Sequence, residues 1–366
     1  MNATLVTGAD GHVGRALARH LLERSDDALV LFVRAAGVDE QRVKRQKLGA
    51  LAVHPRCRVV FGDLRAPDPF EAVDPDEVSA ILHCAAVTSF TVDRATATEV
   101  NVIGTKKALE FAACCTRLRR FGLVSTIYAC GLRDGVIDEA AFEEAPGYAN
   151  YYEWSKWQAE RLVLGQPDLP SHVYRLATIV AEDPGGAVVQ HNALHNTLRL
   201  MYYGLLSVVP GNTATRVYTT STADVARSIG SLFLHDDATG IWHVSDAGSA
   251  ALTLGEFTEI AYEAFRADPA FARRRILKPL FCDHESFVSL VEGIGQFGSI
   301  VSQSLQSVAP FARQLYSDKD VRTARTDRAL GRPSPDPRGL VDAAARFLVR
   351  RRWGNRPKTI GGGADA

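Results

Sequence analysis

Short apolar runs alternate with longer amphipathic stretches through the first 180 residues of the chain. Six runs are apolar over much of their length, as expected for strands of a parallel sheet that is covered on both faces. They are Ala3–Val6, Ala28–Val33, Arg58–Phe61, Ala80–Cys84, Phe121–Val124 and Val173–Leu176. Helical periodicity marks the stretches between them, at Val13–Leu22, Gln41–Leu51, Ala95–Cys115 and Tyr152–Leu164. This alternation predicts an α/β fold with a doubly wound parallel sheet.

The regular alternation ends after Leu176. A helical stretch follows at His191–Tyr203, and Thr253 with Glu256 matches the capping box of a helix that ends near Phe265. We expect strands at Arg216–Thr219 and Ile241–Ser245 that return to the sheet. The predicted organisation is a Rossmann domain over residues 1–180, a smaller and mostly helical C-terminal substrate subdomain over 181–215 and 246–355, and a disordered tail over 356–366.

Composition narrows the classes of function. Lys plus Arg and Asp plus Glu each number 42, and this balance argues against a nucleic-acid-binding protein. The six cysteines form no C-x-x-C pair and no zinc-site spacing, so we expect free thiols and no metal. No apolar run approaches the roughly 20 residues of a transmembrane helix. The first expected strand begins at Ala3, which leaves no room for a signal peptide and favours a cytoplasmic protein.

A glycine-rich turn lies between the first expected strand and the first expected helix. Its residues are Thr7, Gly8, Ala9, Asp10, Gly11, His12, Val13 and Gly14. Gly8 permits a tight turn, Gly11 lets the backbone approach a pyrophosphate, and Gly14 lets the helix pack on the sheet. The helix N-terminus then offers free N–H groups to a diphosphate. A glycine motif in this strand–turn–helix context predicts a dinucleotide-binding site.

The end of the second expected strand indicates which nicotinamide cofactor binds. An NAD site usually has an acidic residue there, whereas this chain has Arg34. A guanidinium suits the 2′-phosphate of NADPH, so we expect NADPH in preference to NADH. Asp63 and Leu64 follow the third strand and are candidates for contacts with the adenine. The small residues Ala85 and Ala86 follow the fourth strand, where a ribose or nicotinamide can pass closely.

Tyr152 and Lys156 are four residues apart on an expected helix and therefore share one face. The ammonium and the oxidised nicotinamide are both expected to lower the pKa of the phenol, so that Tyr152 exchanges a proton with a carbonyl or alcohol oxygen. Lys156 is also expected to hold the hydroxyls of the nicotinamide ribose. The fifth strand ends in Ser125 and Thr126, and either hydroxyl could reach the same oxygen.

These motifs together resemble the extended branch of the short-chain dehydrogenase/reductase superfamily. The shared features are T-G-x-x-G-x-x-G, Asp63-Leu64, Asn101 to Thr105, Ser125-Thr126 and Y-x-x-x-K. Within that branch the chain is similar to the thioester reductase and fatty acyl-CoA reductase group. The resemblance implies NADPH, catalysis by Thr126, Tyr152 and Lys156, and Asn101 as a supporting polar group. The chain has Arg175-Leu176-Ala177 where the family usually has an Arg-Pro pair.

The leading hypothesis is an NADPH-dependent reductase of an acyl-type carbonyl, with a thioester favoured, that gives an aldehyde or an alcohol. Coenzyme A or a free-standing acyl carrier protein would then present the substrate. An alternative keeps the same site but acts on a ketone, a secondary alcohol or a nucleotide sugar, as a dehydrogenase or epimerase. A third hypothesis is a nucleotide-sensing regulator on the same fold.

Residues 276–315 contain more apolar side chains than a loop needs. They include Phe281, Phe287, Val288, Leu290, Val291, Ile294, Phe297, Ile300 and Val301. Three interpretations stay open: a core helix pair, a wall of an acyl tunnel that leads towards Tyr152, or a membrane-surface contact. Gly293, Gly295 and Gly298 are expected to break helical continuity there.

Overall fold

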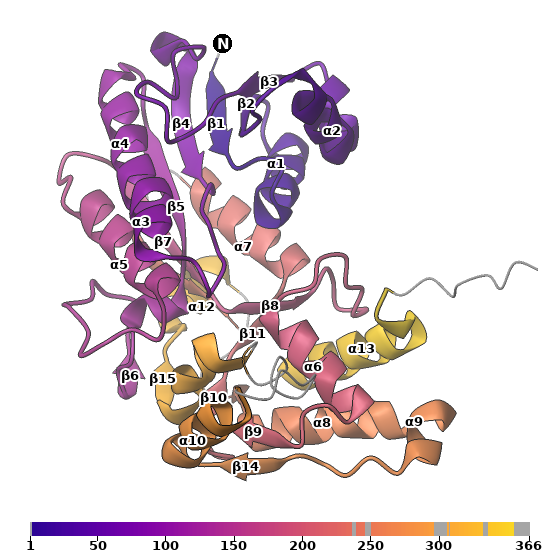
Figure 1. The fold of residues 1–366 in the computed structure, drawn as a ribbon. Coiled ribbons are helices and arrows are strands. Elements are labelled where there is room, and N and C mark those ends of the chain that lie inside the picture. Colours follow the sequence, from indigo (N-terminus) through magenta and orange to yellow (C-terminus); the bar gives the residue numbers. More distant parts are fainter. Residues whose placement is uncertain are drawn as a thin grey trace, which may run out of the picture.

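The computed structural model describes residues 2–235, 239–245, 250–295, 306, 308–331 and 336–354. Seven strands form one parallel sheet in the order β12-β7-β5-β4-β1-β2-β3 (Figure 1). Their bounds are β1 Ala3–Thr7, β2 Ala28–Val33, β3 Cys57–Phe61, β4 Val78–His83, β5 Arg120–Thr126, β7 Ser171–Leu176 and β12 Gly240–Val244. The six strands expected in the first 180 residues are all present, and the doubly wound fold is confirmed.

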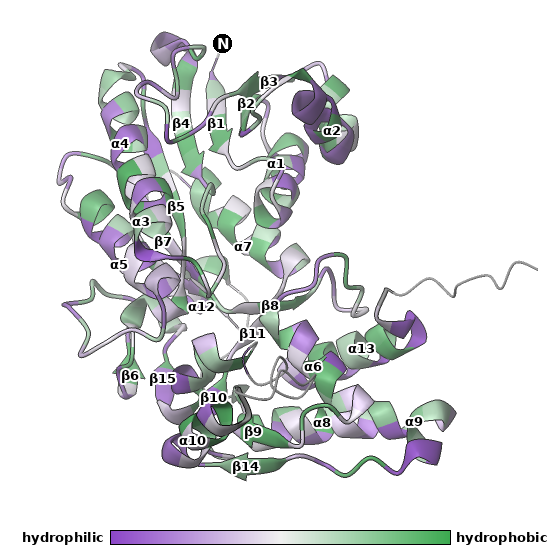
Figure 2. Ribbon diagram, viewed as in Figure 1, coloured by the Kyte–Doolittle hydropathy of each residue, from purple (hydrophilic) through white to green (hydrophobic). Residues whose placement is uncertain are grey.

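Helices cover both faces of this sheet. On one face, α1 (His12–Arg24) and α7 (Thr222–Leu234) bury Leu17, Leu21 and Phe233 against the strands. On the other face, α4 (Gly104–Cys114) and α5 (Tyr151–Leu164) bury Ala112 and Val163. Hydrophobic residues concentrate in the central strands, whereas α2 (Val38–Leu48) is largely hydrophilic (Figure 2). The two apolar layers fix the carboxyl ends of β1, β4 and β5 at one edge, where the candidate site residues lie.

The single helix expected over Ala95–Cys115 is interrupted. It consists of α3 (Arg94–Ala97), a π-helical segment at Thr98–Ile103 and then α4. Hydrophobic periodicity does not distinguish a π turn from an α turn, so this feature was missed. π-Helical turns occur frequently at functional sites, and this one contains the buried side chain of Asn101.

A second layer packs below the carboxyl edge of the sheet (Figure 1). Its helices are α6 Ala193–Tyr203, α8 Leu254–Arg266, α9 Pro269–Arg274, α10 His284–Gly295 and α13 Pro337–Arg350. Most of them surround a separate apolar core that includes Met201, Phe257 and Phe265. Helix α12 (Ala324–Leu330) instead packs against α7 and β12 of the large sheet. The capping box expected at the start of α8 is confirmed, because the Thr253 hydroxyl accepts from the Glu256 N–H and the Glu256 carboxylate accepts from the Thr253 N–H.

Of the two strands expected after residue 180 to join the large sheet, one does so. β12 joins the large sheet beside β7, but β10 (Arg216–Val217) pairs with β13 (Leu252–Thr253) and β11 (Thr219–Ser221) pairs with β8 (Thr178–Ala181). Two further strand pairs are β9 (Val208–Pro210) with β14 (Leu280–Cys282) and β6 (Gly135–Ile137) with β15 (Lys319–Val321). The expected strand at 216–219 was therefore wrong as a strand of the main sheet. The expected tail at 356–366 lies outside the described residues.

The apolar stretch at 276–315 contributes to the second core. Phe287 is 2% exposed, and Leu290 and Val291 pack against the same cluster. Helix α10 continues through Gly293 to Gly295, so the break expected at Gly293 is absent. The side chain of Ile294 and residues Phe297, Gly298, Ile300 and Val301 lie outside the described part of the chain. No helix in the described residues is long and apolar enough to cross a membrane.

Candidate active site

The glycine-rich turn connects β1 to α1 and leaves no room for side chains at two positions. Gly8 has a φ of +64°, and a Cβ there would lie 2.8 Å from the Ala85 Cα. A Cβ on Gly14 would lie 2.3 Å from the Gly8 carbonyl oxygen. Gly11 donates its N–H to that same carbonyl oxygen at 2.9 Å. The turn therefore presents backbone to the adjoining cavity, as a pyrophosphate requires.

Thr7 orders the loop that passes beneath this turn. Its hydroxyl oxygen accepts from the N–H groups of Cys84 and Ala85, both at 3.1 Å. The Thr7 hydroxyl therefore donates to His83 Nδ1, 2.8 Å away, and His83 Nε2 donates to Thr105 Oγ1 at 3.2 Å. Burial lowers the pKa of His83 to about 3, which keeps the imidazole neutral for this relay. Ala85 lies against Gly8, and Ala86 lines the cavity.

Asp10 is held by two lysines of α2. Its Oδ2 accepts from Lys44 Nζ at 2.8 Å and from Lys47 Nζ at 3.3 Å. Burial raises the pKa of Asp10, but the two ammonium groups outweigh it and bring the pKa below its ordinary value. Lys47 also lines the cavity. The carboxylate beside the glycine turn is thus neutralised by neighbouring cations.

His12 and Val13 begin α1 and line the cavity. The His12 ring contacts the Thr222 hydroxyl at 2.6 Å and the Glu182 carboxylate at 3.3 Å. Burial lowers the pKa of His12. This side chain ties the glycine turn to the first residue of α7 and to the loop after β8.

Arg34 follows β2 and is exposed, and its charge helps to lower the pKa of Asp63. The Asp63 carboxylate, expected to face an adenine, is engaged by the Arg65 guanidinium at 2.7 Å. The Leu64 side chain is buried against Gly104 of α4. Arg34, Asp63 and Leu64 therefore lie at the carboxyl ends of β2 and β3, but they do not line the cavity that reaches Tyr152.

Thr126, Tyr152 and Lys156 meet at the carboxyl end of β5, and all three line one cavity. Asn150 caps α5 by accepting from the Glu153 N–H, which fixes the turn that contains Tyr152. A side-chain hydrogen bond joins Thr126 and Tyr152. Lys156 Nζ donates to the Val124 carbonyl oxygen at 2.6 Å. The spacing predicted from the sequence thus places a hydroxyl, a phenol and an ammonium around one space.

The expected effect of Lys156 on the phenol was wrong for the protein alone. Burial raises the pKa of Tyr152 above its ordinary value, and the hydrogen bond with Thr126 only partly opposes this. Burial also lowers the pKa of Lys156 to about 8. Desolvation dominates because protein atoms surround both groups. Tyr152 is consequently a neutral phenol, the form that can donate a proton.

Asn101 braces the site from the π-helical segment. Its Oδ1 accepts from the Val87 N–H at 2.8 Å, and its Nδ2 donates to the Val87 carbonyl at 3.0 Å and to Ser155 Oγ at 2.9 Å. Asn101 is 1% exposed and does not line the cavity. It therefore links the loop after β4 to α5, next to the cavity.

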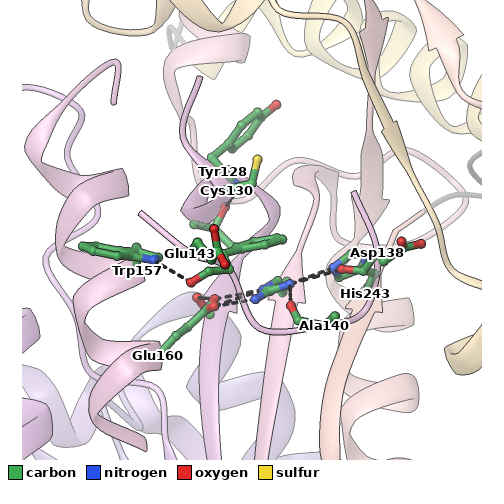
Figure 3. A network of polar contacts seen from close by, with 12 residues as sticks. Tyr128, Cys130, Asp138, Ala140, Glu143, Trp157, Glu160 and His243 are labelled. Carbon is green, nitrogen blue, oxygen red and sulfur yellow. Dashed lines mark hydrogen bonds and ion pairs between the residues drawn. The ribbon is translucent and has the colours of Figure 1, made fainter. Parts of the chain in front are cut away.

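A buried ion pair lies between α5 and the sheet (Figure 3). Glu160 accepts from the Ser125 hydroxyl and forms an ion pair with Arg175, whose Nη2 lies 2.7 Å from Glu160 Oε2. Arg175 Nη1 donates to the Ala140 carbonyl at 2.9 Å. The same Nη1 lies 3.3 Å from His243 Nε2. This network joins α5 to β5, β7 and β12. Sequence reasoning missed it, although Glu160 shares a helix face with Lys156.

A cavity of about 470 Å³ connects the glycine turn with the second layer. Gly8, Gly11 and His12 line this cavity together with Tyr152. The apolar part is lined by Leu198, Met201, Val209, Leu254, Phe257, Val308 and Leu315. Sequence reasoning did not single out these residues, because they come from elements far apart in the chain. α6 contributes Thr197, Leu198 and Met201 from one face, so it forms a continuous wall.

This fold and site define a nicotinamide-dependent oxidoreductase of the extended short-chain dehydrogenase/reductase type. The model of an NAD-binding family, described as male sterility protein, matches residues 6–229, and the chain belongs to this family. The glycine turn has the uncovered backbone that a nicotinamide dinucleotide requires, so the residues present fit the cofactor.

One of the subunits of linear gramicidin synthase from Brevibacillus parabrevis is 30% identical over 204 residues, which cover 50% of this chain and 4% of that protein. Fatty acyl-CoA reductase 2 from Homo sapiens is 29% identical over 157 residues, which cover 38% of this chain and 30% of that protein. The terminal R domain from the myxalamid PKS-NRPS biosynthetic pathway has a TM-score of 0.77 at 22% identity, over 96% of this chain and 92% of that one. The chain thus spans at most 30% of either curated relative.

Proposed function

We propose that this protein is an NADPH-dependent reductase that reduces the carbonyl of an acyl thioester. The observation that carries the proposal is the one cavity that is lined by the glycine turn, by Tyr152 and by a set of apolar side chains. A relative named fatty acyl-CoA reductase supports an acyl substrate. The similarity to a gramicidin synthase supports presentation by a carrier protein as well as by coenzyme A.

The lining of the cavity favours an acyl chain over a nucleotide sugar. Among the described lining residues, the acidic and basic side chains are His12, Lys47, Glu153 and Lys156. None of the lining residues contributed by α6 and α8 is charged, whereas a second diphosphate would need cations there. An apolar chain gains by leaving water for this cavity, at about 25 cal/mol per Å² of buried apolar surface.

The chain's own residues supply proton transfer and orientation. The cofactor, when bound, supplies the hydride. Tyr152, as a neutral phenol, donates its proton to the carbonyl oxygen, and the Thr126 hydroxyl supports that oxygen as negative charge develops. Lys156 would hold the nicotinamide ribose while its ammonium favours the phenolate left on Tyr152. Loss of the thiol from the reduced carbon would then release an aldehyde, which a second round could convert to the alcohol.

We further propose that Arg34 selects NADPH, with Lys44 and Lys47 adding positive charge near the adenosine end. Asp63 and Leu64 would border the adenine, and Ala85 and Ala86 would let the ribose pass closely. Thr7, Asp10 and Val13 would belong to the same cofactor site, and Asn101 would maintain its geometry.

The direct test is to incubate the purified protein with NADPH and, separately, acyl-CoAs, ketones and nucleotide sugars. We expect NADPH oxidation with aldehyde or alcohol formation only for the thioesters. Oxidation with ketones or sugars and none with thioesters would overturn the proposal. A titration of NADPH and NADH by fluorescence would test the cofactor preference separately.

A further inference from the structure

Two phenylalanine rings follow Tyr152 in the lining of the cavity, Phe90 in contact with Tyr152 and Phe311 in contact with Phe90. Phe90 lies in the loop after β4, and its ring centroid is 5.9 Å from that of Tyr152. Phe311 belongs to the second layer, and its ring centroid is 5.9 Å from that of Phe90. Both rings are only partly buried, and both line the cavity. Tyr152, Phe90 and Phe311 therefore form a continuous aromatic row.

The row leaves no space for another ring between its members. Centroid separations of 4.5–7 Å are those of directly packed aromatic pairs. The interplanar angles are 46° between Phe90 and Tyr152 and 51° between Phe90 and Phe311, so the rings are tilted against one another. A bulky group close to the reacting carbon would have to displace one of them.

Hydrogen bonds hold Phe311 in place from the catalytic helix. Asn150 Nδ2 donates to the Pro310 carbonyl at 3.1 Å, and Gln314 Nε2 donates to Glu153 Oε2 at 2.8 Å. Glu153 is 1% exposed and Gln314 is 7% exposed, so the second contact is shielded from water. Phe311 lies between these two anchored positions. The ring is therefore fixed relative to Tyr152 by the same helix turn that places the phenol.

We propose that Phe90 and Phe311 act as a steric filter that admits straight-chain acyl groups and excludes those that are branched or aromatic at the carbon next to the carbonyl. The proposal rests on the thioester reductase function proposed above. A carbonyl oxygen within hydrogen-bonding distance of Tyr152 brings that neighbouring carbon against the aromatic row. The rest of a straight chain extends past the rings into the compartment lined by Met201 and Phe257.

The test compares kcat/KM for hexanoyl-CoA, 2-methylhexanoyl-CoA and benzoyl-CoA at saturating NADPH. The wild type should prefer hexanoyl-CoA over both others by about 10- to 100-fold, the usual effect of one excluded group. Phe90→Ala and Phe311→Ala should each lower this preference at least tenfold. Phe311→Leu provides the same measurement if the alanine variant does not fold. Cofactor affinity and Tm are measured for every variant.

Phe257→Ala is the matched control, because Phe257 lines the same cavity from α8 within the second core. It should leave the ratio of branched to straight substrate within about threefold. An unchanged ratio in both filter variants would overturn the proposal, and so would an equal increase in Phe257→Ala. If the wild type reduces none of the three thioesters, the proposed function itself fails and the filter falls with it.

Discussion

Replacing Glu160 with glutamine removes a buried negative charge and keeps the size of the side chain. In the wild type, Arg175 is fully buried, and Glu160 accepts from both its Nε and its Nη2. A glutamine retains one acceptor oxygen but leaves the guanidinium without a counter-charge. The remaining main-chain acceptor within 3 Å is the Ala140 carbonyl, at 2.9 Å. An arginine side chain keeps its charge in proteins, so the positive charge would stay buried in this variant.

Removal of one partner from a buried pair costs about 3–5 kcal/mol. We expect the lower part of that range, because the glutamine oxygen still accepts one hydrogen bond. The entropy of unfolding is about 2.1 cal/mol/K per residue. For the 366 residues of this chain that gives about 0.77 kcal/mol/K, so a loss of about 3–4 kcal/mol should lower Tm by about 4–5 °C.

Urea unfolding followed by circular dichroism measures the loss in free energy, and scanning calorimetry measures Tm. Arg175→Met is the informative partner variant. It leaves the Glu160 carboxylate buried without its guanidinium, so it should also lose about 3–5 kcal/mol of stability. A double variant, Glu160→Leu with Arg175→Met, should recover most of the stability. A loss below about 1 kcal/mol in Glu160→Gln would refute the buried pair.

Four further outcomes follow from the site. Tyr152→Phe should cut kcat by about 10²- to 10⁴-fold with little change in cofactor affinity, and unaltered turnover would remove Tyr152 as the acid. Arg34→Ala should weaken NADPH binding by about 1.5–3 kcal/mol and leave NADH binding nearly unchanged, as fluorescence titration would measure. Because burial lowers the pKa of Lys156 to about 8, kcat/KM should decline above that pH. In Glu160→Gln the decline should begin at lower pH, since Glu160 raises the pKa of Lys156; a pH profile with no decline would contradict this. Gly14→Ala places a Cβ 2.3 Å from a backbone oxygen, and should lower the unfolding free energy by about 1–3 kcal/mol and weaken cofactor binding, whereas a stable variant with normal binding would contradict the turn geometry.

Local signals account for what the sequence predicted well. The strand at Ala28–Val33 was located from its own apolar run, and β2 has the same bounds. The glycine turn and the pair of Tyr152 and Lys156 depend on residues no more than one or two helical turns apart. Each of these patterns is decided within a short window, so no knowledge of the packing was needed.

Contacts between distant segments could not be predicted in this way. Asn150 and Pro310 are 160 residues apart, and nothing near either residue indicates the other. The placement of Phe311 beside Phe90 depends on that contact. The sign of the pKa shift of Tyr152 was missed for a related reason. The charge of Lys156 is visible in the sequence, whereas the burial that outweighs it arises only from packing around α5.

The connectivity of the large sheet affects how this protein can be divided or recombined. The chain leaves the sheet after β7, builds α6 and β9 in the second layer, returns for α7 and β12, and leaves again. The returning helix fits tightly, since a Cβ on Gly230 would lie 2.2 Å from the His20 ring. A fragment that stops at residue 180 would expose the α7-facing side of α1 and open β7 as an edge strand. The two layers are interleaved, so no single cut yields two foldable halves. Grafting another substrate compartment onto this cofactor layer therefore means exchanging two separate inserts together.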